Sequence, residues 1–233
     1  MANILFMDTE KIIWFLDNVD KQAMLALNFD GGGFLDMLFW TVSSKLIWVP
    51  IALYFIYELA FSRRSGLRKV VLAVCGIALT VLLCDQISSS IIKPLVMRPR
   101  PSHCIGISEM LHYVNDYHGG AFGFVSSHSA NAFGVAAYAS CMLRKRWFSV
   151  FIFVFAAMVA YSRVYLGVHY LGDILGGCVL GLAVGYPVYY AVSALFRVEM
   201  AGMGGVLLRR SVAFVGVCRM FLTLAFEVFQ RRF

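Results

Sequence analysis

The chain has 233 residues, of which 61% are hydrophobic and 14% are charged, and its formal net charge at pH 7 is +7. A soluble globular domain is about half apolar and about a quarter charged, so the composition excludes that class and indicates a polytopic membrane protein. Nucleic-acid binding is excluded as well, because the basic residues are scattered at the ends of apolar runs. In a membrane protein, an excess of basic residues is typical of cytoplasmic loops and of contact with anionic headgroups.

Residues 1–33 form an N-terminal segment of their own. Apolar and charged side chains are interleaved in residues 10–17, which predicts an amphipathic helix on a membrane surface or on the mouth of the bundle. The segment has no basic start and no uninterrupted apolar core, so it is not predicted to be a cleavable signal peptide. Asp30 and the three glycines after it break the chain before the next segment.

Residues 34–200 alternate long apolar runs with polar connections, which predicts a transmembrane bundle. After a short lead-in from Phe34, the predicted spans are Leu46–Phe61, Val70–Ile92, Ser127–Leu143, Phe148–Tyr161 and Leu171–Phe196. Residues 201–233 are apolar but contain arginines, so residues 206–229 are either a sixth span or an interfacial helix. The expected fold class is all-α, with five to six spans and the N-terminal amphipathic helix.

Two basic clusters predict how the bundle is oriented. Arg63–Lys69 and Arg144–Arg146 lie in the first and third connections of the core, and both are expected to be cytoplasmic. The long loop 93–127 and the turn Ser162–Asp173 are then expected to lie together at the outer face. Within the last predicted span, glycines recur every four residues from Gly177 to Gly185, which predicts a smooth face for close helix packing.

The long loop opens with three cations within eight residues, Lys93, Arg98 and Arg100. One interpretation is a charged collar that contacts lipid headgroups. The other is an anion clamp, because arginine makes bidentate contacts with phosphate and lysine adds a point charge. The prolines between these residues stiffen the segment and favour a fixed clamp.

The same loop closes with Ser126, Ser127 and His128 at the start of the third predicted span. Serines before an apolar helix are ordinary N-caps, and that structural role is expected here. The first turn of a helix also offers free backbone N–H groups and a positive dipole end to an anion. His128 lies on that turn, where an imidazole can donate a proton to a departing oxygen.

The turn before the last span brings Arg163, His169 and Asp173 to the edge of an apolar slab. Charged residues are costly there unless they are paired or reach a polar cavity, so they are functional candidates. His169 and Asp173 are one helical turn apart, and the carboxylate can accept one imidazole N–H and leave the other nitrogen as a nucleophile or base. The structural alternative is a helix start with polar side chains that reach the membrane interface.

Together these three stretches fit phosphoryl transfer, in which positioning and charge neutralisation do most of the catalytic work. Cations and amides already oppose the charge of a phosphate, and no dense cluster of metal ligands is present in the sequence. The six cysteines include no C-x-x-C pair, so neither a zinc site nor a disulfide framework is indicated. No metal and no cofactor are predicted.

The three stretches resemble the signature motifs of the type 2 phosphatidic acid phosphatase superfamily. Lys93 with Arg100-Pro101 matches the first motif, Ser126 and His128 keep two positions of the second, and Ser162-Arg163, His169 and Asp173 match the third in full. The departures are Val125 in place of proline and Ser127 in place of glycine. Neither removes a catalytic side chain, although Ser127 could narrow the approach to the backbone amides.

The resemblance implies a role for each matched residue. His169 is expected to form a phosphohistidine intermediate with the assistance of Asp173, and His128 to protonate the leaving group. The phosphoryl oxygens are expected to be held by Lys93, Arg100, Ser126, Arg163 and the amides near Ser127. The resemblance thus implies a metal-independent lipid phosphatase whose active site faces the periplasm, or the outside, of a bacterial plasma membrane.

The expected partners are the bilayer and a lipid phosphate or diphosphate, with no nucleic acid and no particular oligomeric state predicted. Among the substrates of similar proteins, undecaprenyl diphosphate is ranked first because the chain is one small bundle, and lipid A phosphate second. Phosphatidylglycerophosphate and phosphatidate are further alternatives. Two other classes stay open at this point, a vanadate-dependent haloperoxidase and a non-catalytic lipid-binding membrane protein.

Overall fold

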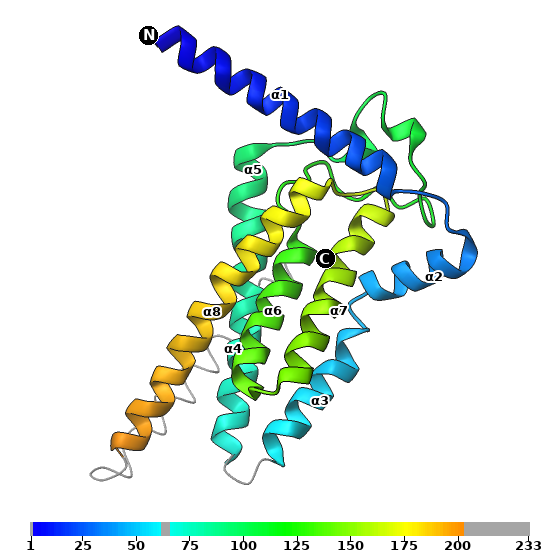
Figure 1. Ribbon diagram of the computed structural model, residues 1–233. Helices are drawn as coiled ribbons and strands as arrows, with labels where there is room; N and C mark the ends of the chain where they lie inside the picture. The colour runs from blue at the N-terminus through cyan, green and yellow to red at the C-terminus, as the bar shows by residue number, and fades with distance from the viewer. Residues whose placement is uncertain (1, 62–65, 203–233) are drawn as a thin grey trace.

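The computed structural model describes residues 2–61 and 66–202, which form a bundle of long helices (Figure 1). The bundle contains α3 (Trp48–Ala60), α4 (Leu67–Gln86), α6 (Ser127–Leu143), α7 (Arg146–Tyr165) and α8 (Leu171–Gly202). Two helices precede it, α1 (Ala2–Leu27) and α2 (Gly32–Ser43). The described residues form no strand beyond a single bridge between Pro99 and Phe122, so the predicted all-α class is confirmed.

Three helical stretches are long and apolar enough to cross a membrane: Leu67–Val96, Arg146–Tyr165 and Leu171–Phe196. The pair formed by α2 and α3, bent by 48° at its break, could add a fourth, whereas α6 has only 17 residues. These helices fit an integral membrane protein, but the predicted count of five to six spans is not confirmed. The segment 206–229, named as a possible sixth span, lies outside the described residues.

The second span is longer than predicted and carries Lys93 on a helix. After α4, the chain continues through a π-helical stretch, η1 (Ile87–Ile92), and then α5 (Lys93–Val96). The helix ends at Met97, whose backbone is left-handed (φ 48°) and whose N–H donates to the carbonyl of Lys93. Pro94 does not stop the helix, since the chain stays helical from Lys93 to Val96.

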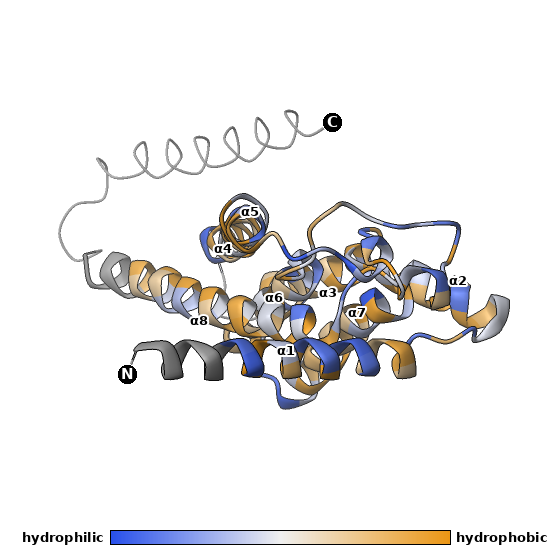
Figure 2. Cartoon of the chain, turned by 90° about the horizontal axis from the view of Figure 1, so that it is seen from above, coloured by the Kyte–Doolittle hydropathy of each residue, from blue (hydrophilic) through white to orange (hydrophobic). Residues whose placement is uncertain are grey.

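Helix α1 crosses the end of the bundle at which α5 stops and α8 begins (Figure 1). Hydrophilic and hydrophobic residues are mixed along α1, whereas the bundle helices are mostly hydrophobic (Figure 2). Several of its large apolar side chains are exposed, among them Ile13 at 63% and Trp14 at 70%, whereas Met24 is buried at 0%. These features agree with an amphipathic helix, and its place at a membrane surface stays a prediction.

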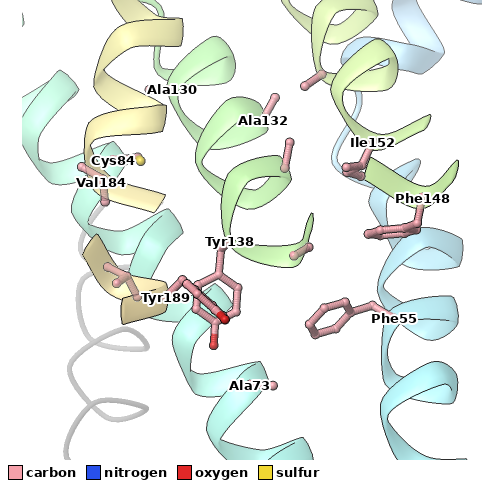
Figure 3. Close-up of a cluster of buried hydrophobic side chains, with 14 of the residues drawn as sticks. Phe55, Ala73, Cys84, Ala130, Ala132, Tyr138, Phe148, Ile152, Val184 and Tyr189 are labelled. Carbon is pink, nitrogen blue, oxygen red and sulfur yellow. The ribbon is translucent and has the colours of Figure 1, made fainter. Parts of the chain in front are cut away.

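The core lies where the bundle helices face one another. Phe55 of α3, Tyr138 of α6 and Phe148 of α7 belong to one buried cluster (Figure 3). Helices α6 and α8 are in backbone contact, since a Cβ atom at Gly181 would lie 2.4 Å from the carbonyl oxygen of Ala130. The glycine face predicted for this helix therefore does pack closely, and it fixes the start of α8 beside the start of α6.

The two ends of the bundle differ in chemistry. At one end, the end that α1 crosses, lie the loop from 97 to 126 and the turn from 166 to 170 (Figure 1). At the opposite end lies the basic cluster 144–146, where Lys145 forms an ion pair of 2.5 Å with Glu58. The two motif-bearing connections thus meet at one end, as predicted. Arg63 and Arg64 of the other basic cluster lie outside the described residues.

Candidate active site

The turn between α7 and α8 folds back on the end of α7. Gly167 has a left-handed backbone (φ 77°), a conformation that glycine adopts at little cost. The backbone N–H groups of Val168 and His169 both donate to the carbonyl of Arg163, at 3.1 and 3.2 Å. The sharp turn thus anchors His169 to the backbone of Arg163.

His169 and Asp173 form a buried pair. The imidazole Nδ1 lies 3.3 Å from Oδ2 of Asp173, and the two side chains are 1% and 0% exposed. The same carboxylate oxygen accepts the backbone N–H of Tyr170 at 3.1 Å, which fixes its orientation in the first turn of α8. When Nδ1–H donates to Asp173, the lone pair of Nε2 is available as a nucleophile.

Burial and positive charge both act on this imidazole. Burial of His169, followed by the charges of Arg100, Arg163 and Lys93, holds its pKa well below the ordinary value. The ring therefore stays neutral at physiological pH, which is the state that a nucleophilic nitrogen requires.

The second motif is tied to the third through Asp173. Ser126 is the N-cap of α6 as predicted, because its hydroxyl accepts the backbone N–H of Ser129 at 3.4 Å. The backbone N–H of Ser126 donates to the carbonyl of Asp173 at 2.9 Å. The loop that contains Ser126 is tied to the first motif as well, since the N–H of Gly123 donates to the carbonyl of Arg98 at 2.9 Å.

Two buried guanidinium groups use only some of their N–H donors within the described part of the chain. Arg100 donates through Nε to the carbonyl of Phe122 at 3.1 Å, and Arg163 donates to the hydroxyls of Tyr117 and Ser43. Arg100 Nη1 and Arg163 Nε are buried and have no hydrogen-bond partner within the part of the chain that the structure describes. A buried unpaired donor is costly, and an anion that accepts from both would remove that cost.

Lys93 and Ser127 lie in direct contact. The ammonium of Lys93 donates to the hydroxyl of Ser127 at 3.0 Å. Ser88 donates to the same hydroxyl at 2.8 Å, and the Ser89 hydroxyl lies 3.0 Å from it. The π-helical stretch η1 thus places two serines against the first turn of α6, and the side chain of Ser127 is a partner of the lysine that is predicted to hold phosphate.

His128 belongs to the same site. Electrostatic interactions link its ring with Arg163, His169, Lys93 and Arg100. The structure therefore brings all eight predicted site residues together at one end of the bundle: Lys93, Arg100, Ser126, Ser127, His128, Arg163, His169 and Asp173. Two imidazoles and three cations at one end of the bundle are groups that can bind and transfer a phosphoryl group.

Sequence reasoning did not assign a role to Arg98, although it was counted among the cations of the loop. Its guanidinium donates to Oδ1 of Asp173 at 3.0 Å and so contacts the His169–Asp173 pair directly. The motif spacing contains no signal for this contact, because it joins residues 75 positions apart.

One group of potential metal ligands occurs in the described residues, Asp30, Asp36 and His112, with ligand atoms within 4.8 Å of one another. It includes none of the predicted site residues. Asp36 already accepts from the His112 ring at 2.9 Å and from the hydroxyl of Tyr165 at 2.6 Å. His112 is thus a partly buried residue that ties the loop to α2 and α7.

Comparison with known proteins gives a consistent result. The model of the PAP2 superfamily matches residues 69–197. The chain is 39% identical over 186 residues to the lipid A 4'-phosphatase of Bacteroides thetaiotaomicron, covering 79% of this chain and 81% of the relative. It is 35% identical over 175 residues to the lipid A 4'-phosphatase of Porphyromonas gingivalis, covering 75% and 73%.

A solved structure shares the fold. The crystal structure of a transmembrane PAP2 type phosphatidylglycerolphosphate phosphatase from Bacillus subtilis superposes with a TM-score of 0.56. The superposition covers 78% of this chain and 86% of the other, at 22% sequence identity. At that identity, the likeness concerns the arrangement of the helices.

Proposed function

This chain belongs to the PAP2 superfamily, and from that premise we propose that it removes a phosphate group from lipid A at the outer face of a bacterial inner membrane. The chain is an integral membrane lipid phosphatase, a hydrolase of phosphoric monoesters. The proposed substrate is supported by the two relatives that align over three quarters or more of the chain, both lipid A 4'-phosphatases. Neither is named for undecaprenyl diphosphate, so lipid A now stands ahead of the substrate that the sequence analysis ranked first.

The proposed chemistry rests on one observation, the buried His169–Asp173 pair beside two guanidinium donors without partners. In the first step, Nε2 of His169 attacks the phosphorus atom, and the bond between phosphorus and the sugar oxygen breaks. The electron pair of that bond goes to the sugar oxygen, which takes a proton from the imidazolium form of His128 and leaves that ring neutral. The product alcohol leaves and the phosphoryl group stays on His169.

In the second step, a water molecule attacks the phosphohistidine, and His128 accepts its proton. The bond between phosphorus and Nε2 breaks, and the electron pair returns to the imidazole. Inorganic phosphate is released, and His169 is neutral again. Asp173 keeps the ring in one tautomer through both steps, because its carboxylate accepts Nδ1–H.

The cations stabilise the phosphoryl oxygens while charge redistributes. Arg100 Nη1 and Arg163 Nε can each donate a hydrogen bond to a phosphoryl oxygen. The ammonium of Lys93 is held in place by its hydrogen bond to Ser127. The free N–H groups of the first turn of α6, after its N-cap Ser126, add further donors. Since Arg100 and Arg163 are buried, their interaction with a phosphate is stronger than it would be in water.

The test is phosphate release by the detergent-purified protein from a panel of lipid A, undecaprenyl diphosphate, phosphatidylglycerophosphate and phosphatidate. We expect the highest kcat/KM with lipid A, and mass spectrometry of the product should show loss of the 4'-phosphate. His169→Asn should reduce kcat by roughly 10⁴-fold or more. The matched control is His103→Asn at an exposed loop position, which should leave the rate unchanged.

Two outcomes would contradict the proposal. A higher kcat/KM with undecaprenyl diphosphate than with lipid A would overturn the substrate. Full activity in His169→Asn on any lipid of the panel would overturn the mechanism.

A further inference from the structure

Arg98 contacts Asp173 of the His169–Asp173 pair, and we place it apart from the cations that are proposed to bind phosphate. Its Nη1 donates to Oδ1 of Asp173 at 3.0 Å, while the other carboxylate oxygen, Oδ2, faces Nδ1 of His169. Arg98 and His169 therefore occupy the two oxygens of one buried carboxylate. Any rotation of that carboxylate would break one of these contacts.

Two carboxylates of α1 hold the same guanidinium from the other side. Oδ2 of Asp20 accepts from Nη1 of Arg98 at 2.7 Å, and Oδ1 of Asp17 accepts from Nη2 at 3.1 Å. The Asp20 side chain is only 12% exposed, so this contact is more than a solvated surface pair. Asp20 also accepts the backbone N–H of Gly172 at 2.8 Å, one residue before Asp173.

The guanidinium is fixed in a third direction by an aromatic ring. Its central carbon lies 4.2 Å from the centroid of Tyr170, a cation–π distance. Tyr170 is itself buried and follows His169 directly in the chain. With two α1 carboxylates, Asp173 and this ring as neighbours, Arg98 is engaged within the protein and differs in this from Arg100 and Arg163.

We propose that Arg98 is a positioning residue for the His169–Asp173 pair, and that Asp17 and Asp20 of α1 hold Arg98 in place. The proposal rests on the proposed function, because it assigns the pair its catalytic role. A carboxylate buried without a fixed cationic partner would turn more freely and would favour the protonated form of the neighbouring imidazole. Arg98 opposes both effects, and α1 thereby becomes part of the active-site architecture.

The first measurement compares Arg98→Lys and Arg98→Ala with the wild-type protein. Because Arg98 is proposed to act through Asp173 and not to bind phosphate, kcat should fall by roughly 10- to 100-fold in Arg98→Ala while KM changes by less than about twofold. Arg98→Lys keeps the charge but lacks the planar fork, so it should recover part of the lost kcat. Circular dichroism and thermal unfolding in detergent check that both variants fold.

The pH profile separates positioning from folding. The charged and titratable groups that act on His169 are Lys93, Arg100, Arg163, the ring of His128 and the carboxylate of Asp173. Loss of Arg98 leaves that carboxylate less compensated, so the acid limb of kcat should move to higher pH. If Arg98→Ala only reduced the amount of folded protein, the maximum of kcat would fall and the pH of the acid limb would not change.

The role of α1 is tested by a double-mutant cycle. Asp17→Asn and Asp20→Asn should each lower kcat in the wild-type background, and Asp17→Asn should have no further effect in the Arg98→Ala background, since it acts through Arg98. Glu10→Gln, at an exposed position of the same helix, is the matched control and should be neutral in both backgrounds.

The outcomes distinguish this inference from the proposed function. If the wild type hydrolyses lipid A and His169→Asn does not, yet the Arg98 variants keep the wild-type kcat and pH profile, the positioning role is wrong and the mechanism stands. If His169→Asn is fully active, the mechanism itself fails. Additive effects of Asp17→Asn and Arg98→Ala would refute the part assigned to α1.

Discussion

The ammonium of Lys93 and the hydroxyl of Ser127 lie 3.0 Å apart, although the two residues belong to different helices and are 34 positions apart in the chain. Lys93 stands on α5, at the end of the second span, and Ser127 is the first residue of α6. The family motif has glycine where this chain has Ser127. The hydroxyl that replaces it therefore acts on the lysine, and this gives the first prediction.

Replacement of Ser127 by alanine should misplace the Lys93 ammonium. A hydrogen bond to a charged group contributes roughly 1.5–3 kcal/mol, so kcat/KM for lipid phosphate should fall by about 10- to 100-fold. Ser149→Ala, at the opposite end of the bundle, removes a comparable hydroxyl and should change kcat/KM little. Wild-type kcat/KM in Ser127→Ala would show that Lys93 does not depend on this contact.

The pH dependence of kcat/KM follows from the lowered pKa of His169. Burial and the cations around the ring keep it neutral, so on the acid side activity should be lost as the pH falls through that lowered pKa, well below the ordinary value of about 6.5. The sign for stability is the same, because the unfolded chain takes up the proton near pH 6.5 (about the ordinary pKa) and the folded chain does not. Folding stability is therefore full above that pH and declines below it.

Arg100→Gln tests the cause of that shift. Removing one of the positive charges that act on His169 should raise its pKa, so the acid limb of kcat/KM should move to higher pH as the maximum falls. Arg146→Gln, exposed at the other end of the bundle, is the control and should leave the limb unchanged. An unmoved limb in Arg100→Gln would mean that another group titrates there.

The mechanism as proposed uses no metal ion. Phosphate release should therefore continue unchanged after dialysis against EDTA and after addition of Mg²⁺ or Zn²⁺. The measurement is kcat with lipid A before and after chelation, with the metal content of the sample determined in parallel. A rate that vanishes with EDTA and returns with a divalent cation would contradict this part of the mechanism.

The contact between α6 and α8 should be sensitive to a single methyl group. A Cβ atom at Gly181 would lie 2.4 Å from the carbonyl oxygen of Ala130, so Gly181→Ala must push the helices apart. Overpacking of this kind costs about 1–3 kcal/mol, which thermal unfolding in detergent should detect. Gly33→Ala is the control, because no atom lies within 4 Å of the added group, and it should not lower the unfolding temperature.

The sequence predicted the parts of the site that depend on local spacing. His169 and Asp173 are four residues apart, and helix geometry alone brings them together once α8 starts at Leu171. The convergence of the two outer connections followed from span counting. Ser126 was predicted as an N-cap because its position directly before an apolar helix is a local signal.

Contacts between distant segments could not be predicted in this way. Arg98 meets Asp20 across 78 positions, and His112 meets Asp36 across 76, and neither pair follows a period in the sequence. The position of Lys93 was misjudged because Pro94 and the polar residues after it resemble a loop. A proline does not by itself end a helix, and α5 continues through Pro94 to Val96.

The unpaired donors of Arg100 and Arg163 also bear on turnover. Inorganic phosphate presents the same oxygen atoms as the esterified group, so the donors that receive the substrate will retain the spent ion as well. We therefore expect competitive inhibition by free orthophosphate. In the cell, the reaction rate should then depend on how quickly phosphate is removed from the cell envelope.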